Sequence, residues 1–159
     1  ATFDEVTEPD VVVIPGGVGT RKLIKDEVIL DWIRAVHPGT LFTTSVCTGS
    51  LVLAAAGLLD GMTATTHWST QDILASLGAV YTQDRVVEHR PQRIITAAGV
   101  SSGIDMALRL LELLVDRQAA EASQLMIEYD PQPPFNCGSL AKAPDRIVEL
   151  AREYSEQRD

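Results

Sequence analysis

Apolar and polar positions along the chain follow patterns that predict two kinds of element. Short continuous apolar or β-branched runs predict buried strands, and they cover residues 10–14, 41–46, 62–66 and 93–97. Residues 79–88 instead alternate apolar and polar positions, which predicts an antiparallel strand or an excursion at a sheet edge. The chain therefore contains the strands that a central sheet needs.

Apolar residues three or four positions apart predict helices between and after these strands. The predicted helices cover residues 20–36, the Leu, Val and Ala run at 51–57, and residues 69–77, 103–115, 116–129 and 144–156. Strands and helices that alternate in this way predict an α/β fold, with a mostly parallel sheet and helices on both faces. We expect residues 1–159 to form a single domain.

Composition narrows the class of protein. The 159 residues are 45% hydrophobic and 22% charged, which is ordinary for a globular domain. A net charge of -9 disfavours nucleic acid and anionic membranes as partners. The two cysteines do not make a disulfide framework, and no apolar run reaches the ~18 residues of a membrane span. We expect a cytoplasmic protein without a cofactor, a nucleic-acid partner or a membrane partner.

Cys47 lies where strand composition changes to helix composition, so we expect it at a sharp strand-to-helix turn. Small residues stand two positions before it (Ser45) and two after it (Gly49), which is the steric pattern of a nucleophile elbow. Amides at the helix start are expected to favour the thiolate. A buried, inert cysteine is the alternative, but the strand–helix context favours the nucleophile.

Two other strand ends carry candidate site residues. Gly17 follows the first buried strand, and its amide, with that of Thr48, is expected to stabilise a developing anion. His67 ends the 62–66 strand, just before a helix that a capping box at Ser69–Asp72 is expected to open. A structural histidine is the alternative there. Cys137, in a loop rich in Pro and Gly, is interpreted as structural or incidental. Together these residues predict covalent catalysis on a small electrophile.

Four motifs occur in order along the chain: DVVVIPGG, SVCTGS followed by an Ala/Leu helix, ATTHW, and Gly-x-x-x-Gly-Ile-Asp at Gly99 to Asp105. Together they resemble the DJ-1/PfpI (ThiJ/PfpI, class I glutamine amidotransferase-like) superfamily. The continuation IEYDPQPPFNCGS resembles the isocyanide hydratase-like branch. The resemblance implies a flavodoxin-like three-layer sandwich and a homodimer. It also implies Cys47 as nucleophile, the Gly17 and Thr48 amides as anion donors, and His67 near the thiol.

The chain departs from the family pattern in two places. Relatives called proteases carry His directly after the cysteine, whereas Thr48 stands here, which favours the hydratase branch. Family members also have a strand and helix before the PGG strand, about 50–60 residues for such a βαβ unit, with an acidic residue that contacts the thiol. We therefore expect the chain to be N-terminally incomplete relative to the family.

The resemblance implies a cysteine-dependent hydratase that converts isocyanides to N-substituted formamides through a Cys47 thioimidate. Glyoxalase- or deglycase-like chemistry on reactive carbonyls is one alternative. The ligand-binding domain of an AraC-type regulator is another, and it would need a helix-turn-helix region downstream.

Overall fold

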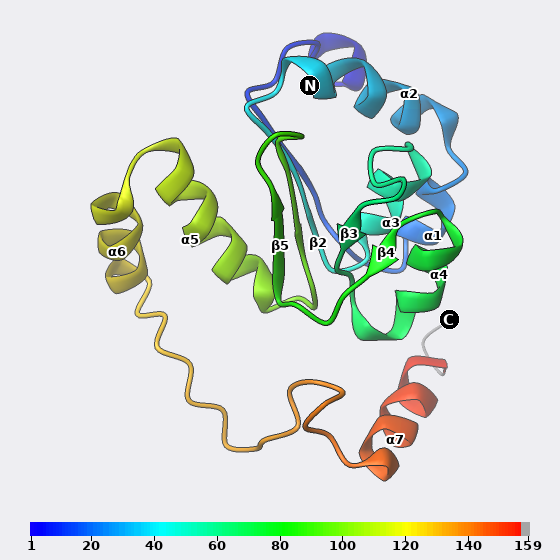
Figure 1. Cartoon of the computed structure of the whole chain (residues 1–159), viewed down its shortest axis with the longest axis vertical. Coiled ribbons are helices and arrows are strands. Elements are labelled where there is room, and N and C mark those ends of the chain that lie inside the picture. Colours follow the sequence, from blue (N-terminus) through cyan, green and yellow to red (C-terminus); the bar gives the residue numbers. More distant parts are fainter. Residues whose placement is uncertain (157–159) are drawn as a thin grey trace. The chain divides into compact units, whose positions relative to one another are not determined.

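A four-stranded mixed sheet lies at the centre of residues 1–107 in the computed structural model, which describes residues 1–156 (Figure 1). Its strand order is β1 (Val11–Ile14), β2 (Phe42–Val46), β6 (Ile94–Ala97) and β5 (Val86–His89). The first three strands are parallel, and β5 is antiparallel to β6. The runs at 10–14, 41–46 and 93–97 are thus confirmed as strands of one sheet. Of the segment 79–88, only the part from Val86 on forms the expected antiparallel strand, β5, whereas residues 80–81 belong to a separate parallel pair.

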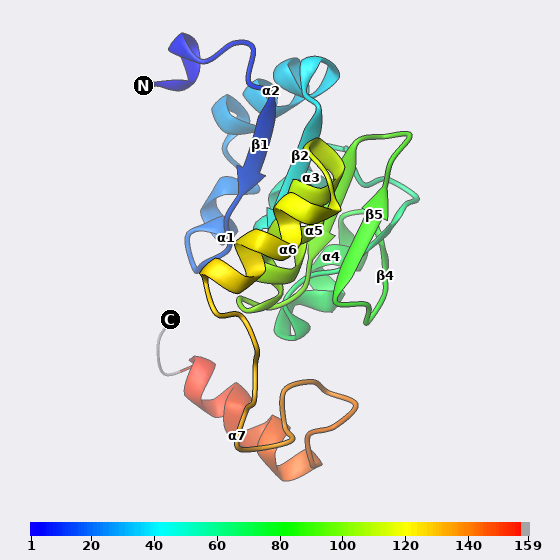
Figure 2. The same ribbon diagram turned by 90° about the vertical axis from the view of Figure 1, so that its left-hand side faces the viewer.

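One face of this sheet packs against α2 (Glu27–Val36), α3 (Gly49–Ala55) and α4 (Gln71–Ser76). The largest fully buried apolar side chains of this layer are Leu30, Ile33, Leu51, Leu53, Leu59, Leu74, Ile94 and Val52. Residues 102–107, which begin α5 (Ser102–Leu114), lie on the opposite face of the sheet from α3 (Figures 1 and 2). Helices on both faces of a mostly parallel sheet confirm the flavodoxin-like α/β fold.

α5 approaches the sheet closely because its second residue is glycine. A Cβ built on Gly103 would lie 3.0 Å from Cγ1 of Val46, so a larger residue would push helix and strand apart. Val46 directly precedes Cys47, and the helix therefore packs beside the turn that carries the cysteine.

Two predicted elements differ from the structure. The helix expected over residues 20–36 is divided into α1 (Thr20–Leu23) and α2, because the Asp26 side chain accepts a hydrogen bond from the Val28 amide and starts a new helix. The strand expected over 62–66 is only β3 (Thr63–Ala64), which pairs with β4 (Val80–Tyr81) in a separate two-stranded sheet. Thr65 and Thr66 leave the strand because they bond elsewhere. The Thr65 amide donates to Thr96 Oγ1 of the main sheet, and the Thr66 hydroxyl donates to the Cys47 carbonyl oxygen.

Residues Leu108–Asp159 form a second compact unit, so the single-domain expectation stays a prediction. This unit contains the end of α5, then α6 (Arg117–Met126) and α7 (Asp145–Glu156). The Asp116 carboxylate caps α6 by accepting from the Ala119 amide at 2.7 Å. Short 3₁₀ helices complete the described elements: η1 (Phe3–Glu5), η2 (His37–Gly39) and η3 (Trp68–Thr70). No helix in the described part of the chain has both the length and the hydrophobicity that a bilayer crossing requires.

Candidate active site

Cys47 occupies the turn between β2 and α3 with a φ of 57°. That left-handed conformation costs a residue with a side chain about 1–2 kcal/mol, so the surrounding structure must hold it in place. The residue is 8% exposed. The sharp strand-to-helix turn that the sequence predicts is therefore present.

Two glycines allow the loop after β1 to lie against this turn. A Cβ built on Gly16 would fall 2.6 Å from the Cβ of Cys47 and 3.0 Å from the Thr48 amide nitrogen. The backbone at Gly49 is equally crowded by the end of β1. The prediction that neighbouring backbone excludes a larger side chain two positions after the cysteine is confirmed.

The Thr48 side chain ties the glycine loop to the start of α3. Its Oγ1 accepts a hydrogen bond from the Gly17 amide at 2.9 Å and lies 3.2 Å from the Gly17 carbonyl oxygen, to which the hydroxyl donates. The Gly17 N–H is thus engaged by the Thr48 hydroxyl. The Gly17 amide can therefore act as the predicted anion donor only after the Thr48 hydroxyl has turned away from the amide.

The protonation of Cys47 depends on burial and on Thr48. Burial is the larger effect and raises the pKa of the Cys47 thiol, whereas the Thr48 amide lowers that pKa, as does the Thr48 hydroxyl when its single proton turns from the Gly17 carbonyl oxygen to the sulfur. The net direction is upward, so the expected preference for the thiolate is not met in this structure. The role of the Thr48 amide as a donor to developing charge on a substrate stays a prediction.

His67 lies at the N-cap of η3 and directly contacts its own loop. Its Nδ1 accepts from the Ser69 amide at 3.4 Å and lies 2.8 Å from Ser69 Oγ. An accepting Nδ1 leaves the proton of the neutral ring on Nε2, and burial lowers the pKa of His67, which favours that neutral ring. The capping box expected at Ser69–Asp72 is wrong: α4 begins at Gln71 without a side-chain cap, because the Ser69 amide bonds to His67 instead.

Sequence reasoning missed two hydroxyls that contact the Cys47 backbone. Ser50 Oγ and Thr66 Oγ1 both donate to the carbonyl oxygen of Cys47, at 3.2 and 3.1 Å. Thr66 directly precedes His67, so this bond brings the His67 segment to the cysteine turn. The only sequence signal was the presence of polar residues at positions predicted to be buried in a strand and at the start of a helix.

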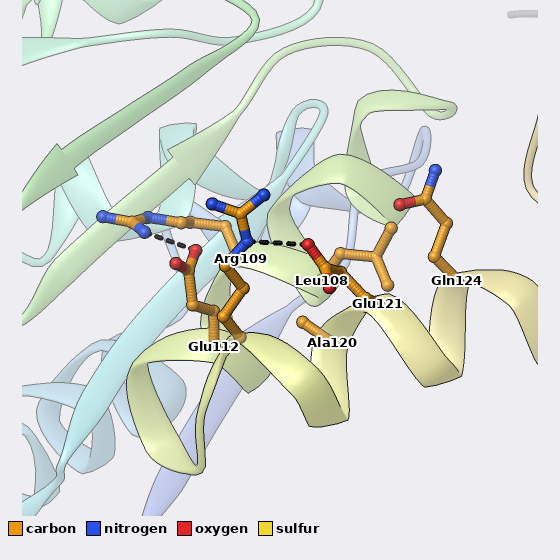
Figure 3. A pocket seen from close by; sticks show the side chains of 7 residues that line it. Leu108, Arg109, Glu112, Ala120, Glu121 and Gln124 are labelled. Carbon is orange, nitrogen blue, oxygen red and sulfur yellow. Dashed lines mark hydrogen bonds and ion pairs between the residues drawn. The ribbon is translucent and has the colours of Figure 1, made fainter.

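Elsewhere, Cys137 is a free, exposed cysteine. Within residues 1–156 no group of three or more His, Cys, Asp or Glu side chains could hold a metal ion. A hollow of about 320 Å³ lies between the end of α5 and α6 (Figure 3), where Arg109 pairs with Glu112 and Arg117 pairs with Glu121. None of the predicted site residues lines it.

Comparison with known proteins places the chain among relatives of related fold and sequence. The model of the DJ-1/PfpI family matches residues 1–113. Isonitrile hydratase of Pseudomonas putida is 47% identical over 152 residues, which cover 96% of this chain and 66% of that protein. The glutathione-independent glyoxalase DJR-1.2 of Caenorhabditis elegans is 30% identical over 105 residues, 66% of this chain and 55% of that protein.

A solved structure of a ThiJ/PfpI family protein from Pseudomonas syringae superimposes with a TM-score of 0.87 at 42% identity. It covers 97% of this chain, and the match extends over 65% of the solved chain. The chain thus spans slightly under two thirds of these longer relatives, and 55% of the glyoxalase.

Proposed function

The chain belongs to the DJ-1/PfpI family, and on that premise we propose that it acts as a cysteine-dependent hydratase that adds water to isocyanides (isonitriles). The observation that carries this proposal is the 47% identity to an isonitrile hydratase across 96% of the chain. The left-handed turn at Cys47 supports it, because a strained strand-to-helix turn is the backbone geometry of a nucleophile elbow.

In the proposed reaction the Cys47 sulfur attacks the terminal carbon of the isocyanide. An S–C bond forms, and the carbon takes up one proton, which gives a thioimidate. Water then adds to that carbon, the C–S bond breaks, and the thiol is restored. The product is an N-substituted formamide, which is the substrate plus one water molecule. The reaction needs no oxidant, reductant or cofactor.

Each predicted residue has a role in this scheme. The Thr48 amide stabilises the sulfur anion, since its hydrogen bond lowers the pKa of Cys47. The Gly17 amide is proposed as a second donor to developing charge. His67, neutral with its proton on Nε2, is proposed as a donor to the substrate nitrogen. The raised pKa of Cys47 requires a group that removes the thiol proton before attack.

The test is formation of formamide from an aryl isocyanide, followed by chromatography. Cys47→Ala should abolish turnover, whereas Cys137→Ser, which changes the exposed cysteine, should retain it. Full activity of Cys47→Ala would contradict the proposal.

Chemistry on reactive carbonyls is the second candidate, favoured by the 30% identity to a glyoxalase. Consumption of methylglyoxal that depends on Cys47, without formamide production, would establish it instead. We also propose that the protein is a cytoplasmic homodimer. Light scattering of the purified protein in solution measures its molar mass and so tests the dimer.

A further inference from the structure

The carbonyl oxygen of Cys47 is held by two side-chain hydroxyls from different parts of the chain. Ser50 Oγ donates to it from the first turn of α3 at 3.2 Å, and Thr66 Oγ1 donates from the loop after β3 at 3.1 Å. Both hydroxyl residues are buried, with exposed fractions of 0% for Ser50 and 1% for Thr66. The carbonyl therefore has a fixed direction in a part of the protein that excludes bulk water.

A fixed carbonyl also fixes the amide on the other side of the same peptide bond. The Cys47 carbonyl and the Thr48 N–H belong to one planar, trans peptide unit, in which C=O and N–H point in opposite directions. The Thr48 backbone amide lowers the pKa of the Cys47 thiol, so this N–H acts on the sulfur. The two hydroxyls that hold the carbonyl oxygen therefore also fix the direction of the N–H.

The hydroxyl of Thr66 is committed to the Cys47 carbonyl. A threonine hydroxyl has a single proton, and that of Thr66 is donated to the Cys47 carbonyl oxygen. The neighbouring Thr70 Oγ1 lies 3.1 Å from Thr66 Oγ1 and donates to the His67 carbonyl oxygen at 3.1 Å. The His67 carbonyl also accepts from the Thr70 amide at 2.9 Å.

We propose that Thr66 is a positioning residue of the cysteine site, which acts with Ser50 to hold the Cys47–Thr48 peptide so that its N–H faces the sulfur. The inference rests on the proposed function in that the oriented amide serves a nucleophilic Cys47. On this inference Thr66 affects the reactivity of the Cys47 thiol indirectly, because the Thr66 side chain bonds to the backbone of Cys47 and not to the sulfur.

The test measures the rate of Cys47 alkylation by iodoacetamide as a function of pH. All variants carry Cys137→Ser, so that Cys47 is the thiol whose alkylation is measured. Thr66→Val keeps the shape and removes the hydroxyl, and it should slow alkylation at pH 7 by about 2- to 12-fold, the worth of one hydrogen bond. The pH profile should move to higher pH. Thr66→Ser keeps the hydroxyl and should restore the rate.

The matched control is Thr44→Val. Thr44 Oγ1 also donates to a backbone carbonyl in the buried sheet, that of Val12 at 3.1 Å, but it does not contact the cysteine turn. It should leave the alkylation profile in place. Ser50→Ala removes the second donor and should shift the profile in the same direction as Thr66→Val, which keeps the proposal testable where Thr66→Val fails to fold.

The outcomes separate this inference from the proposed function. A normal profile in folded Thr66→Val would overturn the inference, even where the wild type hydrates isocyanides. A shifted profile in a protein that turns over no isocyanide would support the inference and remove the hydratase assignment. Where turnover is present, Thr66→Val should lower kcat with KM retained, since the Thr66 side chain is buried and holds the backbone of Cys47.

Discussion

The backbone of Gly49 lies so close to that of Ile14 that a Cβ built on Gly49 would fall 2.1 Å from the Ile14 carbonyl oxygen. This contact joins the start of α3 to the end of β1 and sets the position of the cysteine turn between them. Gly49→Ala should therefore cost more than about 3 kcal/mol in the free energy of unfolding, because even ordinary overpacking costs about 1–3 kcal/mol. Urea unfolding measures it.

Gly19→Ala is the control for this change. Gly19 has α-helical backbone angles, and no atom lies within 4 Å of its built Cβ. Its substitution should be neutral or stabilise the protein by up to about 1 kcal/mol, because alanine restricts the unfolded chain. Equal effects of the two substitutions would show that the contact with Ile14 does not constrain the fold.

Removal of the Thr48 hydroxyl should make Cys47 less acidic. That hydroxyl lowers the pKa of the Cys47 thiol when its proton turns from the Gly17 carbonyl oxygen to the sulfur, and Thr48→Val removes it while retaining the backbone amide. Alkylation of Cys47 should slow by about 2- to 12-fold at neutral pH, and its pH profile should move upward. Thr48→Ser keeps the hydroxyl and should match the wild type; a slow serine variant would assign the effect to shape.

His67→Asn separates a structural role of His67 from a chemical one. The asparagine Oδ1 can replace Nδ1 as the acceptor for the Ser69 amide, but nothing replaces Nε2. If Nε2 donates a proton in the reaction, formamide production should fall by about 10²-fold or more, while the melting temperature changes little. Retained turnover would leave His67 as a cap of η3 only.

His37 should make the protein less stable in acid. Burial lowers the pKa of His37, and the positive charge of Arg93 lowers it further. The unfolded chain then binds a proton near pH 6.5 that the folded chain resists, so stability is intact above about pH 6.5 and is lost as pH falls through that value.

His37→Asn, which can keep the hydrogen bond of Nδ1 to Thr43 Oγ1, should reduce this loss. The measurement is urea unfolding at pH 7.5 and pH 5.5. Part of the acid sensitivity should persist, because burial lowers the pKa of His67 in the same direction. An unchanged difference between the two pH values would exclude His37 as its source.

Local sequence patterns were sufficient where an element depends on its own residues. The apolar run that became β1 and the composition change at Cys47 were both visible in the sequence. The helix break at Asp26 was missed, although an N-cap aspartate carries a local signal. The strand expected at 62–66 was shortened by contacts with residues distant in the chain, which no local pattern contains.

The sequence by itself determined the α/β class, the sharp strand-to-helix turn at Cys47 with its small neighbours, and the family. These follow from periodicity, residue size and motif order, which are properties of short segments. Only the tertiary structure decided that burial raises the pKa of Cys47, that the Gly17 amide bonds to the Thr48 hydroxyl, and that Thr66 holds the Cys47 carbonyl. Desolvation and hydrogen bonds between distant segments depend on which surfaces meet, and that is set only when the whole chain packs.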